Sequence, residues 1–469
     1  MKRIVWGMLI GMVVISGVKA QQQGLVPVLT FEQAVQLAMK NGVLLNTQRN
    51  NLQYSQMQRV TSIAGMGPNI SVNSSVSTLD GNSFNQQQGR VVNGVRDNVT
   101  ASVNANINLF SGFNRMNQIK QYASALDAQT YFVNRTAQDV LNTVSTQYLT
   151  VMLDVELLRI AKENFDALNK QLEQVTEQVN LGARGPVDQY NQDAQTKAAE
   201  LRYVQAEIQM NIDKASLAQT LLIDPLEKFD VERPNWDVNA IGNDNLNTEE
   251  LAERAKQYRG DYQRAVKQEN AQRFAMNAAK GTMMPSLFAF GSIASAYNYQ
   301  RGVQQYLGTD SLGNPIENPN YPRPFSEQFR TNNVQKQYGV QLTIPIFQGL
   351  QNRTTYVQQK VLYQNTQINK NNVEYQIRND VVKAVLNYDG ARKAFAITTV
   401  QLKSAEMAFS LEQERYNLGL TNFVDYINAN RVLVQSQTDK AQAEYRLVFQ
   451  KIMIEYAVGT LRPEDLTKQ

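Results

Sequence analysis

Four short stretches of the chain alternate apolar and polar residues, which is the pattern of β-strands whose two faces meet different surroundings. They lie at about 68–78, 98–110, 286–297 and 337–347, and the alternation is weakest in the third. Each is roughly 10–12 residues long, the length of a membrane-spanning strand, and the polar faces are rich in Asn, Ser and Thr. Phe110 and Phe347 stand at strand ends, where aromatic side chains are expected at a membrane surface. The alternative is a half-buried sheet in a soluble protein.

Two much longer stretches carry apolar residues every seven positions, which predicts helices packed as in coiled coils. Residues 113–181 contain neither Gly nor Pro, and residues 350–418 contain only Gly390. A helix of ~69 residues would be ~100 Å long, which is unusual for a globular domain.

Shorter helices flank the two long ones. They are predicted at 30–67, 187–223, 248–284 and 424–458. Thr30 followed by Gln33 is a capping-box pattern, and Thr248 is expected to open the third helix similarly. Two short helices end to end match one long helix in length, so we expect them to stack against it.

The two halves of the chain repeat one another. Asn180-Leu181-Gly182 recurs as Asn417-Leu418-Gly419 at an offset of 237, and Val187-Asp188 matches Val424-Asp425 at the same offset. This spacing indicates an internal two-fold repeat. The extra residues of the second copy fall in the stretch 298–337, whose Pro and Gly content predicts a surface loop without a further helix or strand.

The domain organisation follows from the repeat and from the N-terminus. It comprises a signal peptide at 1–20, repeat 1 at 21–223, a connector at 224–247, repeat 2 at 248–461 and a tail at 462–469. Lys2 and Arg3 precede a short apolar run, and Val18-Lys19-Ala20 supplies the small residues of a cleavage site. No later run approaches 18 apolar residues, so we expect an exported chain without a membrane helix.

The composition removes several classes of function. The 469 residues include no Cys and no His, which excludes thiolate and imidazole metal sites, haem ligation, disulfides and Ser–His–Asp triads. The formal charge is +4, and three of the cations lie in residues 1–20, so nothing in the charge favours nucleic acid. No Gly-rich phosphate loop or paired-acid motif is present. We therefore expect no enzyme activity, no cofactor and no metal.

Four strands cannot close a barrel, and open sheet edges are not tolerated in lipid because their N–H and C=O groups find no partner there. If these strands span a bilayer, several chains must share one barrel. Two chains would give 8 strands around a filled interior, and three would give 12 strands around a lumen. A structural coiled-coil protein would not explain the strand pairs, and a self-contained porin would need at least 8 strands in one chain.

The order and spacing of the motifs resemble the TolC-like outer-membrane factors of Gram-negative bacteria over essentially the whole mature chain. The motifs are Leu29-Thr30-Phe31-Glu32-Gln33-Ala34, Pro68 and Pro285 before strands, Phe110-Ser111-Gly112 and Phe347-Gln348-Gly349 after strands, the two Asn-Leu-Gly turns, and Gly459-Thr460-Leu461. The resemblance implies a mixed α and β fold. A homotrimer would form a 12-stranded transmembrane β-barrel, with four strands per chain, continued by a long periplasmic α-helical coiled-coil barrel, with 224–247 as an equatorial connector.

The resemblance also implies a function. The chain would be a passive exit duct in the cell outer membrane for small molecules such as drugs and toxic compounds. The alternative is the outer-membrane component of a type I protein secretion system. The expected partners are outer-membrane lipid, a periplasmic adaptor (membrane fusion protein) and an inner-membrane RND or ABC transporter.

In that family the periplasmic tips close like an iris. By residue match, Asp188 corresponds to a latch aspartate, Tyr416 to the latch tyrosine and Asp425 to the outer constriction aspartate. Two positions depart from the family: Thr421 stands in place of the latch arginine and Asn428 in place of the second constriction aspartate. The latch therefore lacks its charged donor, and the entrance should carry about half the usual negative charge.

Two further expectations concern the tips. Arg184, in the other turn, is a candidate substitute for the latch arginine, and both aspartates could also be helix N-capping residues. The turns at Leu181, Gly182, Leu418 and Gly419 are expected to dock the adaptor.

Overall fold

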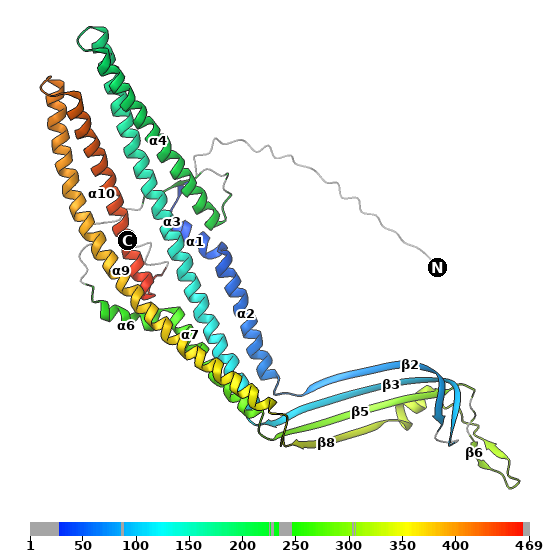
Figure 1. Ribbon diagram of the computed structural model, residues 1–469. Helices are drawn as coiled ribbons and strands as arrows, with labels where there is room; N and C mark the ends of the chain where they lie inside the picture. Colours follow the sequence, from blue (N-terminus) through cyan, green and yellow to red (C-terminus); the bar gives the residue numbers. More distant parts are fainter. Residues whose placement is uncertain are drawn as a thin grey trace, which may run out of the picture.

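The protein is elongated, with a β-sheet at one end and two helical hairpins at the other (Figure 1). The computed structural model describes residues 28–85, 89–224, 226, 229–233, 246–302, 304 and 306–462. The predicted signal peptide, most of the connector and all but the first residue of the tail lie outside the described residues.

The main sheet has four antiparallel strands in the order β2-β3-β5-β8. They are β2 (Asn69–Asn85), β3 (Arg90–Ser111), β5 (Ser286–Gln300) and β8 (Gln335–Thr343). The first two extend well beyond the predicted ranges, and β8 ends before the predicted limit at 347. Pro345 explains the early end, because proline has no N–H for a ladder. A second, small sheet pairs β1 (Val28–Leu29) with β4 (Asp230–Val231) in parallel.

The strand register gives the sheet one apolar and one polar face. Val72 pairs with Val103, which pairs with Ile293, and Ile293 pairs with Lys336. Directly paired residues point to the same face. The same face carries Ile70, Val76, Val99, Ile107, Leu287, Val340 and Leu342, and the other is rich in Asn, Ser and Gln. The register thus assigns faces to β5, whose own alternation is weak.

The stretch 298–337 is not an unstructured loop, which corrects the sequence prediction. It contains β6 (Tyr306–Thr309), β7 (Pro315–Glu317), the short helix α8 (Phe325–Glu327) and the π-helix η1 (Gln328–Asn332). The Asp310 carboxylate accepts from the backbone N–H groups of Leu312 and Asn314, both at 2.8 Å, which closes the turn between β6 and β7. The Gly and Pro residues that predict a loop here therefore belong in part to the turn of a β-hairpin.

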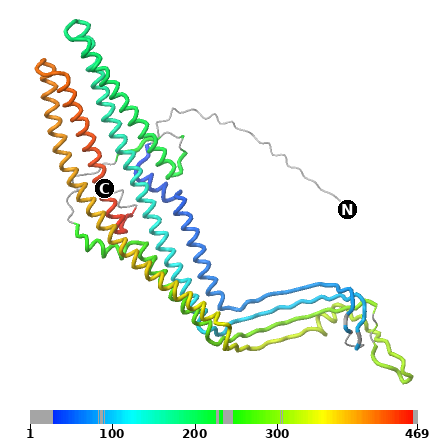
Figure 2. The backbone as a smooth tube through the Cα atoms, viewed as in Figure 1, coloured from blue at the N-terminus to red at the C-terminus, as the bar shows by residue number. Residues whose placement is uncertain are grey.

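Two helical hairpins project from the sheet. They are formed by α3 (Asn114–Asn180) with α4 (Pro186–Leu221), and by α9 (Gln351–Asn417) with α10 (Phe423–Val458). The two long helices have 67 residues each and the two following helices 36 each. Figure 2 shows both connecting turns at the end far from the sheet. Within the described part of the chain, no helix is both long and apolar enough to cross a membrane.

Each shorter helix that precedes the strands is interrupted. The first consists of α1 (Phe31–Asn41) and α2 (Val43–Ala64), and the second of α6 (Thr248–Tyr258) and α7 (Gly260–Gly281). The capping box of Thr30 and Gln33 is confirmed. Thr248 is not the N-cap of α6, because the Asn247 side chain accepts from the N–H groups of the two following glutamates.

The core lies midway along the helices. One cluster joins α1, α3, α4 and α10 around Val144, Tyr148 and Leu221, and a second joins α6, α9 and α10 around Ile377 and Val458. The heptad pattern therefore leads to burial mainly in this equatorial region, where three or more helices meet.

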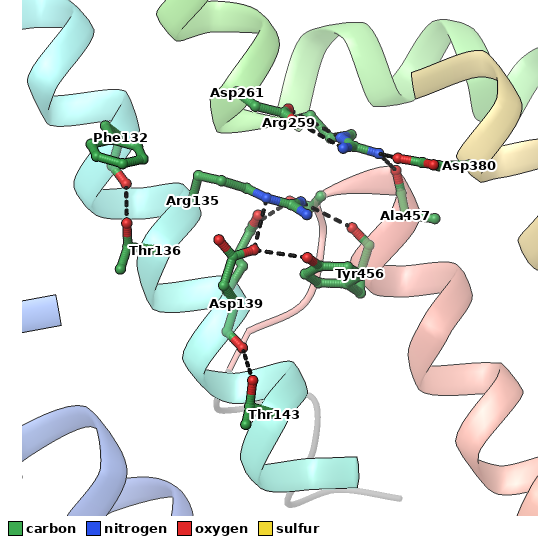
Figure 3. Close-up of polar contacts among 12 residues, drawn as sticks. Phe132, Arg135, Thr136, Asp139, Thr143, Arg259, Asp261, Asp380, Tyr456 and Ala457 are labelled. Atoms are coloured by element: carbon green, nitrogen blue, oxygen red, sulfur yellow. Dashed lines mark hydrogen bonds and ion pairs between the residues drawn. The ribbon is translucent and has the colours of Figure 1, made fainter. Parts of the chain in front are cut away.

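A polar cluster fixes the interruption between α6 and α7 to the neighbouring helices (Figure 3). Arg259 is 4% exposed and donates to Asp261 at 2.6 Å and to Asp380 of α9 at 2.9 Å. Burial raises the pKa of Asp261, but the Arg259 guanidinium outweighs it, so this pKa lies below its usual range. Nearby, the Arg135 guanidinium lies 4.1 Å from the centre of the Tyr456 ring, which ties α3 to α10.

Candidate gate at the helical tips

The two tip turns share one backbone design. Gly182 and Gly419 adopt φ values of +73° and +74°, the left-handed conformation that favours glycine. The amide of the next residue, Ala183 or Leu420, donates 2.8 Å to the carbonyl five residues earlier. This is the Schellman motif, which satisfies the last carbonyls of a helix. The sequence thus stops both long helices at a fixed point and reverses the chain.

The tips expose apolar side chains. Leu181 is 78% exposed and Leu418 is 73% exposed, and Leu420, Val187 and Val424 are exposed beside them. Apolar residues concentrated at the free end of a helical hairpin have no covering partner within the described chain. Such a patch is typical of a surface that binds another protein.

Arg184 links the two hairpins at their tips. Its guanidinium donates from Nη1 to the hydroxyl of Tyr416 and lies 4.6 Å from the centre of the same ring. Tyr416 is 3% exposed and stacks on Tyr426 with ring centres 4.7 Å apart. Burial raises the pKa of Tyr426, with the nearby Tyr416 adding to the effect. A cation from one turn therefore holds an aromatic cluster built from the other.

The Asp425 side chain contacts Thr421, which lies four residues earlier in the chain. Its carboxylate accepts from the Thr421 hydroxyl at 3.4 Å and from the Asn422 amide at 3.0 Å. The N-cap of α10 is Asn422, whose side chain accepts from the Asp425 backbone N–H at 2.9 Å. Asp425 is thus the third helical residue and a partner of the cap rather than the cap itself.

Among the described residues, Asp188 does not contact the expected latch tyrosine Tyr416, and Asn428 makes a hydrogen bond within its own helix. The N-cap of α4 is Gly185, and Asp188 lies in the first turn without a side-chain cap bond. Asn428 accepts from Arg431 of its own helix at 2.9 Å. No contact between Asp188 and Tyr416 is found in the described chain, where Arg184 occupies the tyrosine hydroxyl.

An open cavity of about 350 Å³ lies between the hairpins, on the side of the tips that faces the middle of the helices. Asn164, Asn191 and Arg202 line it from α3 and α4, and Asn428 and Arg431 line it from α10. A second residue pair crosses between the hairpins here, since Asn430 donates to Asn164 at 3.0 Å. The tips are therefore joined by a few polar contacts rather than by a continuous core.

Sequence reasoning missed the aromatic part of this site. Phe423 and Tyr426 both contact Tyr416, and Tyr426 also contacts Phe409. Phe409 and Tyr416 lie seven residues apart, as the heptad pattern of α9 requires, and the spacing of three residues between Phe423 and Tyr426 is a signal for the facing pair. Among the described residues, no cluster of three or more potential acidic, His or Cys ligands could hold a metal.

Comparisons with known proteins agree with this arrangement. The family described as outer membrane efflux protein matches residues 34–221 and 251–460. The outer membrane protein TolC of Escherichia coli K12 is 22% identical over 389 residues, covering 80% of this chain and 73% of TolC. The CmeC outer membrane channel of Campylobacter jejuni superposes with a TM-score of 0.77 at 15% identity, covering 93% of this chain and 88% of CmeC. The outer membrane protein VceC of Vibrio cholerae gives 0.74 at 14% identity, covering 92% and 96%.

Proposed function

The chain belongs to the outer membrane efflux protein family, and from this premise we propose that it is the exit duct of a tripartite export system. It is an outer-membrane protein that extends into the periplasm. In the proposal, three copies enclose a water-filled channel that passively conducts small molecules from an inner-membrane transporter and a periplasmic adaptor. The family consists of efflux channels rather than enzymes, and the duct needs no cofactor.

The observation that carries the proposal is the four-stranded sheet with two open edges. Within the described chain, β2 and β8 each have a strand neighbour on one side only. An open edge in lipid would leave several unpaired N–H and C=O groups, each costing several kcal/mol. Pairing β8 of one copy with β2 of the next removes both edges. Three copies then give 3 × 4 = 12 strands around a lumen.

The apolar face of the sheet fits a bilayer in height. Phe110, paired with Leu287, stands at its inner end, and Tyr297 stands on the same face at its outer end. Leu287 and Tyr297 are ten residues apart, or ~33 Å along the strand. At a tilt of ~45° this becomes ~23 Å, close to the ~25 Å apolar band between the two aromatic girdles of outer-membrane barrels.

The opposite face would line the lumen. Ser71, Asn104, Ser292 and Gln337 form one row across it. Such uncharged polar groups suit a water-filled lumen without strong ion selectivity. Any selectivity between ions would then arise at the helical tips. There the Arg184–Tyr416 contact would act as the latch that Thr421 cannot form, and three copies of Asp425 would surround the entrance.

The exposed leucines of the tips are the proposed adaptor-docking surface. They are at the end of the molecule farthest from the sheet, where a partner in the periplasm would reach them (Figure 2). Because apolar contacts dominate many interface centres, replacing these leucines by a charge should abolish docking.

The test combines assembly, conductance and docking. Purified protein should have the mass of three mature chains and form channels in planar bilayers. Leu181→Asp with Leu418→Asp should still conduct but should no longer co-purify with a crosslinked adaptor. Leu307→Asp changes a similarly exposed leucine on β6; it is the control and should retain the adaptor. Trimers that do not conduct, or a stable monomer in the membrane, would refute the duct.

A further inference from the structure

At the outer end of β5, the backbone groups that face β8 are hydrogen-bonded by side chains rather than by a neighbouring strand. β8 begins at Gln335, opposite Ala294, whereas β5 continues to Gln300. Beyond that point Asn333 donates to the Ala296 carbonyl at 2.7 Å, and the Asn298 N–H donates to the Gln328 side chain at 3.4 Å.

Tyr321 completes this closure. Its hydroxyl lies 3.4 Å from the Gln300 N–H and 3.3 Å from the Gln300 carbonyl. Ser295 also donates to the Phe329 carbonyl at 2.5 Å. Residues 321–333 are therefore held on the strand by their own polar groups, beside the outer end of β8 (yellow-green in Figure 1).

The aromatic rings of this segment lie on the apolar face of the sheet. Tyr297 shares that face with Ile293, because both are odd-numbered residues of β5. The Phe325 ring contacts the Tyr297 ring at 5.2 Å and stacks on the Phe329 ring at 5.0 Å. Phe325 remains exposed. The segment therefore continues the lipid-facing surface outward at the level of the outer aromatic girdle.

Two cations beside these rings lack ion-pair partners in the described chain. They are Arg330 in η1 and Lys336 at the start of β8, both exposed. Two other cations of this region are paired, since Arg301 lies 2.9 Å from Asp97 and Arg323 lies 3.9 Å from Glu327. Lys336 pairs with Ile293 in the register, four residues inward of Tyr297, so it stands on the apolar face and reaches the headgroup level by extending its long side chain outward.

We propose that residues 321–336 form a binding site for a phosphorylated lipid of the outer leaflet. The rings of Phe325, Phe329 and Tyr297 would contact the upper acyl region, and Arg330 and Lys336 would bind the phosphates. An aromatic surface with uncompensated cations at the headgroup level is complementary to an anionic lipid and not to a neutral one. The inference rests on the proposed barrel and adds to it a specific lipid on each of the three copies.

The test measures lipid retention by intact trimers. Purified trimers are titrated with bisphosphorylated lipid A and with its dephosphorylated form, and bound lipid is counted by native mass spectrometry. Arg330→Gln with Lys336→Gln should weaken binding of the bisphosphorylated lipid about 30-fold, at ~1 kcal/mol per cation and ~1.4 kcal/mol per tenfold. Binding of the dephosphorylated lipid should not change.

Arg353→Gln with Lys360→Gln is the matched control, because it removes two exposed cations from α9 and should leave lipid binding unchanged. Phe325→Ser tests the aromatic part and should weaken both lipids. Equal binding of bisphosphorylated lipid A to the wild type and the Arg330/Lys336 variant would overturn the site. Loss of trimers at unchanged lipid binding per trimer would also overturn it and would assign the segment to the contact between copies. Conductance of the same samples separates either failure from failure of the duct.

Discussion

The contact of Arg184 with Tyr416 joins the two tips through one cation on one buried ring. A hydrogen bond from a charged donor contributes ~1.5–3 kcal/mol, and cation–π contact with the ring adds to it. The energy is concentrated in a single side chain, so a single substitution should release the tips.

The first prediction concerns this contact. Arg184→Gln should raise the resting conductance of purified trimers in planar bilayers, with the open fraction increasing about 10-fold. Tyr416→Phe should do so more weakly, because it removes the acceptor oxygen and keeps the ring stack. Arg415→Gln is the control, since Arg415 pairs only with Glu412 of its own helix in the described chain. An unchanged resting conductance in Arg184→Gln would show that the tips are held elsewhere.

The second prediction concerns the entrance charge. Asp425→Asn should reduce cation preference and divalent block, because a symmetric ring of three carboxylates is lost. Asn428→Asp alone should have a small effect, since the new carboxylate would pair with Arg431, which already donates to Asn428. Asn428→Asp with Arg431→Gln should increase cation preference. Reversal potentials across a salt gradient measure this, and no response in either variant would place the constriction at another level.

At the scale of the element, the junction between α6 and α7 at Arg259, here called the elbow, packs against the end of α10. Gly459 has φ +83°, and a Cβ there would lie 2.8 Å from the Arg259 backbone N. A side chain would therefore suffer both a left-handed backbone and a backbone clash.

The third prediction follows from that contact. Gly459→Ala should lower the free energy of unfolding by about 2 kcal/mol or more, seen as a lower apparent Tm of the detergent-solubilised protein. Gly390→Ala should instead raise it by about 0.5–1 kcal/mol, because Gly390 lies within α9 and a Cβ added there would meet open space. Equal effects of the two changes would exclude the elbow as a rigid junction.

The fourth prediction concerns Asp154 of α3, which is 7% exposed. Burial raises the pKa of Asp154 to about 7, and the neighbouring Asp213 of α4 adds to the shift. Because this pKa lies above the ordinary value of 3.8, the folded state binds more protons, and stability falls as pH rises from about 4 to 7. Asp154→Asn should flatten this fall in apparent Tm and stabilise the protein at pH 8. A wild-type profile identical to that of the variant would contradict the shift.

Local patterns predicted the elements well, and contacts between distant residues escaped them. The capping box at Thr30 was readable because both partners lie within one turn. The sequence offers Arg184 only as a candidate substitute for the latch arginine, because 232 residues separate it from Tyr416 and no local pattern joins them. The sequence predicts a surface loop over 298–337, which includes 321–333, since side chains that close a strand edge leave no periodicity. The faces of β5 became clear only from its register with β3 and β8.

At the scale of the whole molecule, the proposed barrel requires the free edge of β8 to pair with a second copy. The backbone groups of even-numbered residues in β5 point toward β8, as the contacts of Ala296 and Asn298 show. In the antiparallel register their β8 partners are odd-numbered, so Val340 directs its N–H to the open edge.

The fifth prediction uses this geometry. Val340→Pro should abolish trimers while leaving the β5–β8 ladder intact, because it removes only an edge N–H. Val340→Thr keeps the N–H and should assemble normally. Native mass spectrometry of detergent extracts distinguishes the two. Stable, conducting trimers of Val340→Pro would show that this edge does not pair between copies.

Because α9 is anchored midway along its length, a small rotation there produces a large displacement at its tip. From Asp380, where Arg259 holds α9, to the last residue of α9 at Asn417 is 37 residues, or ~55 Å of helix. A tilt of ~5° about that anchor would displace the tip by ~5 Å, enough to separate Arg184 from Tyr416. A force applied at the exposed leucines acts at the end of this lever. In the proposed duct, the Arg184–Tyr416 contact therefore lies where a single bond resists the largest torque, and where a small rotation about the anchor is enough to break it.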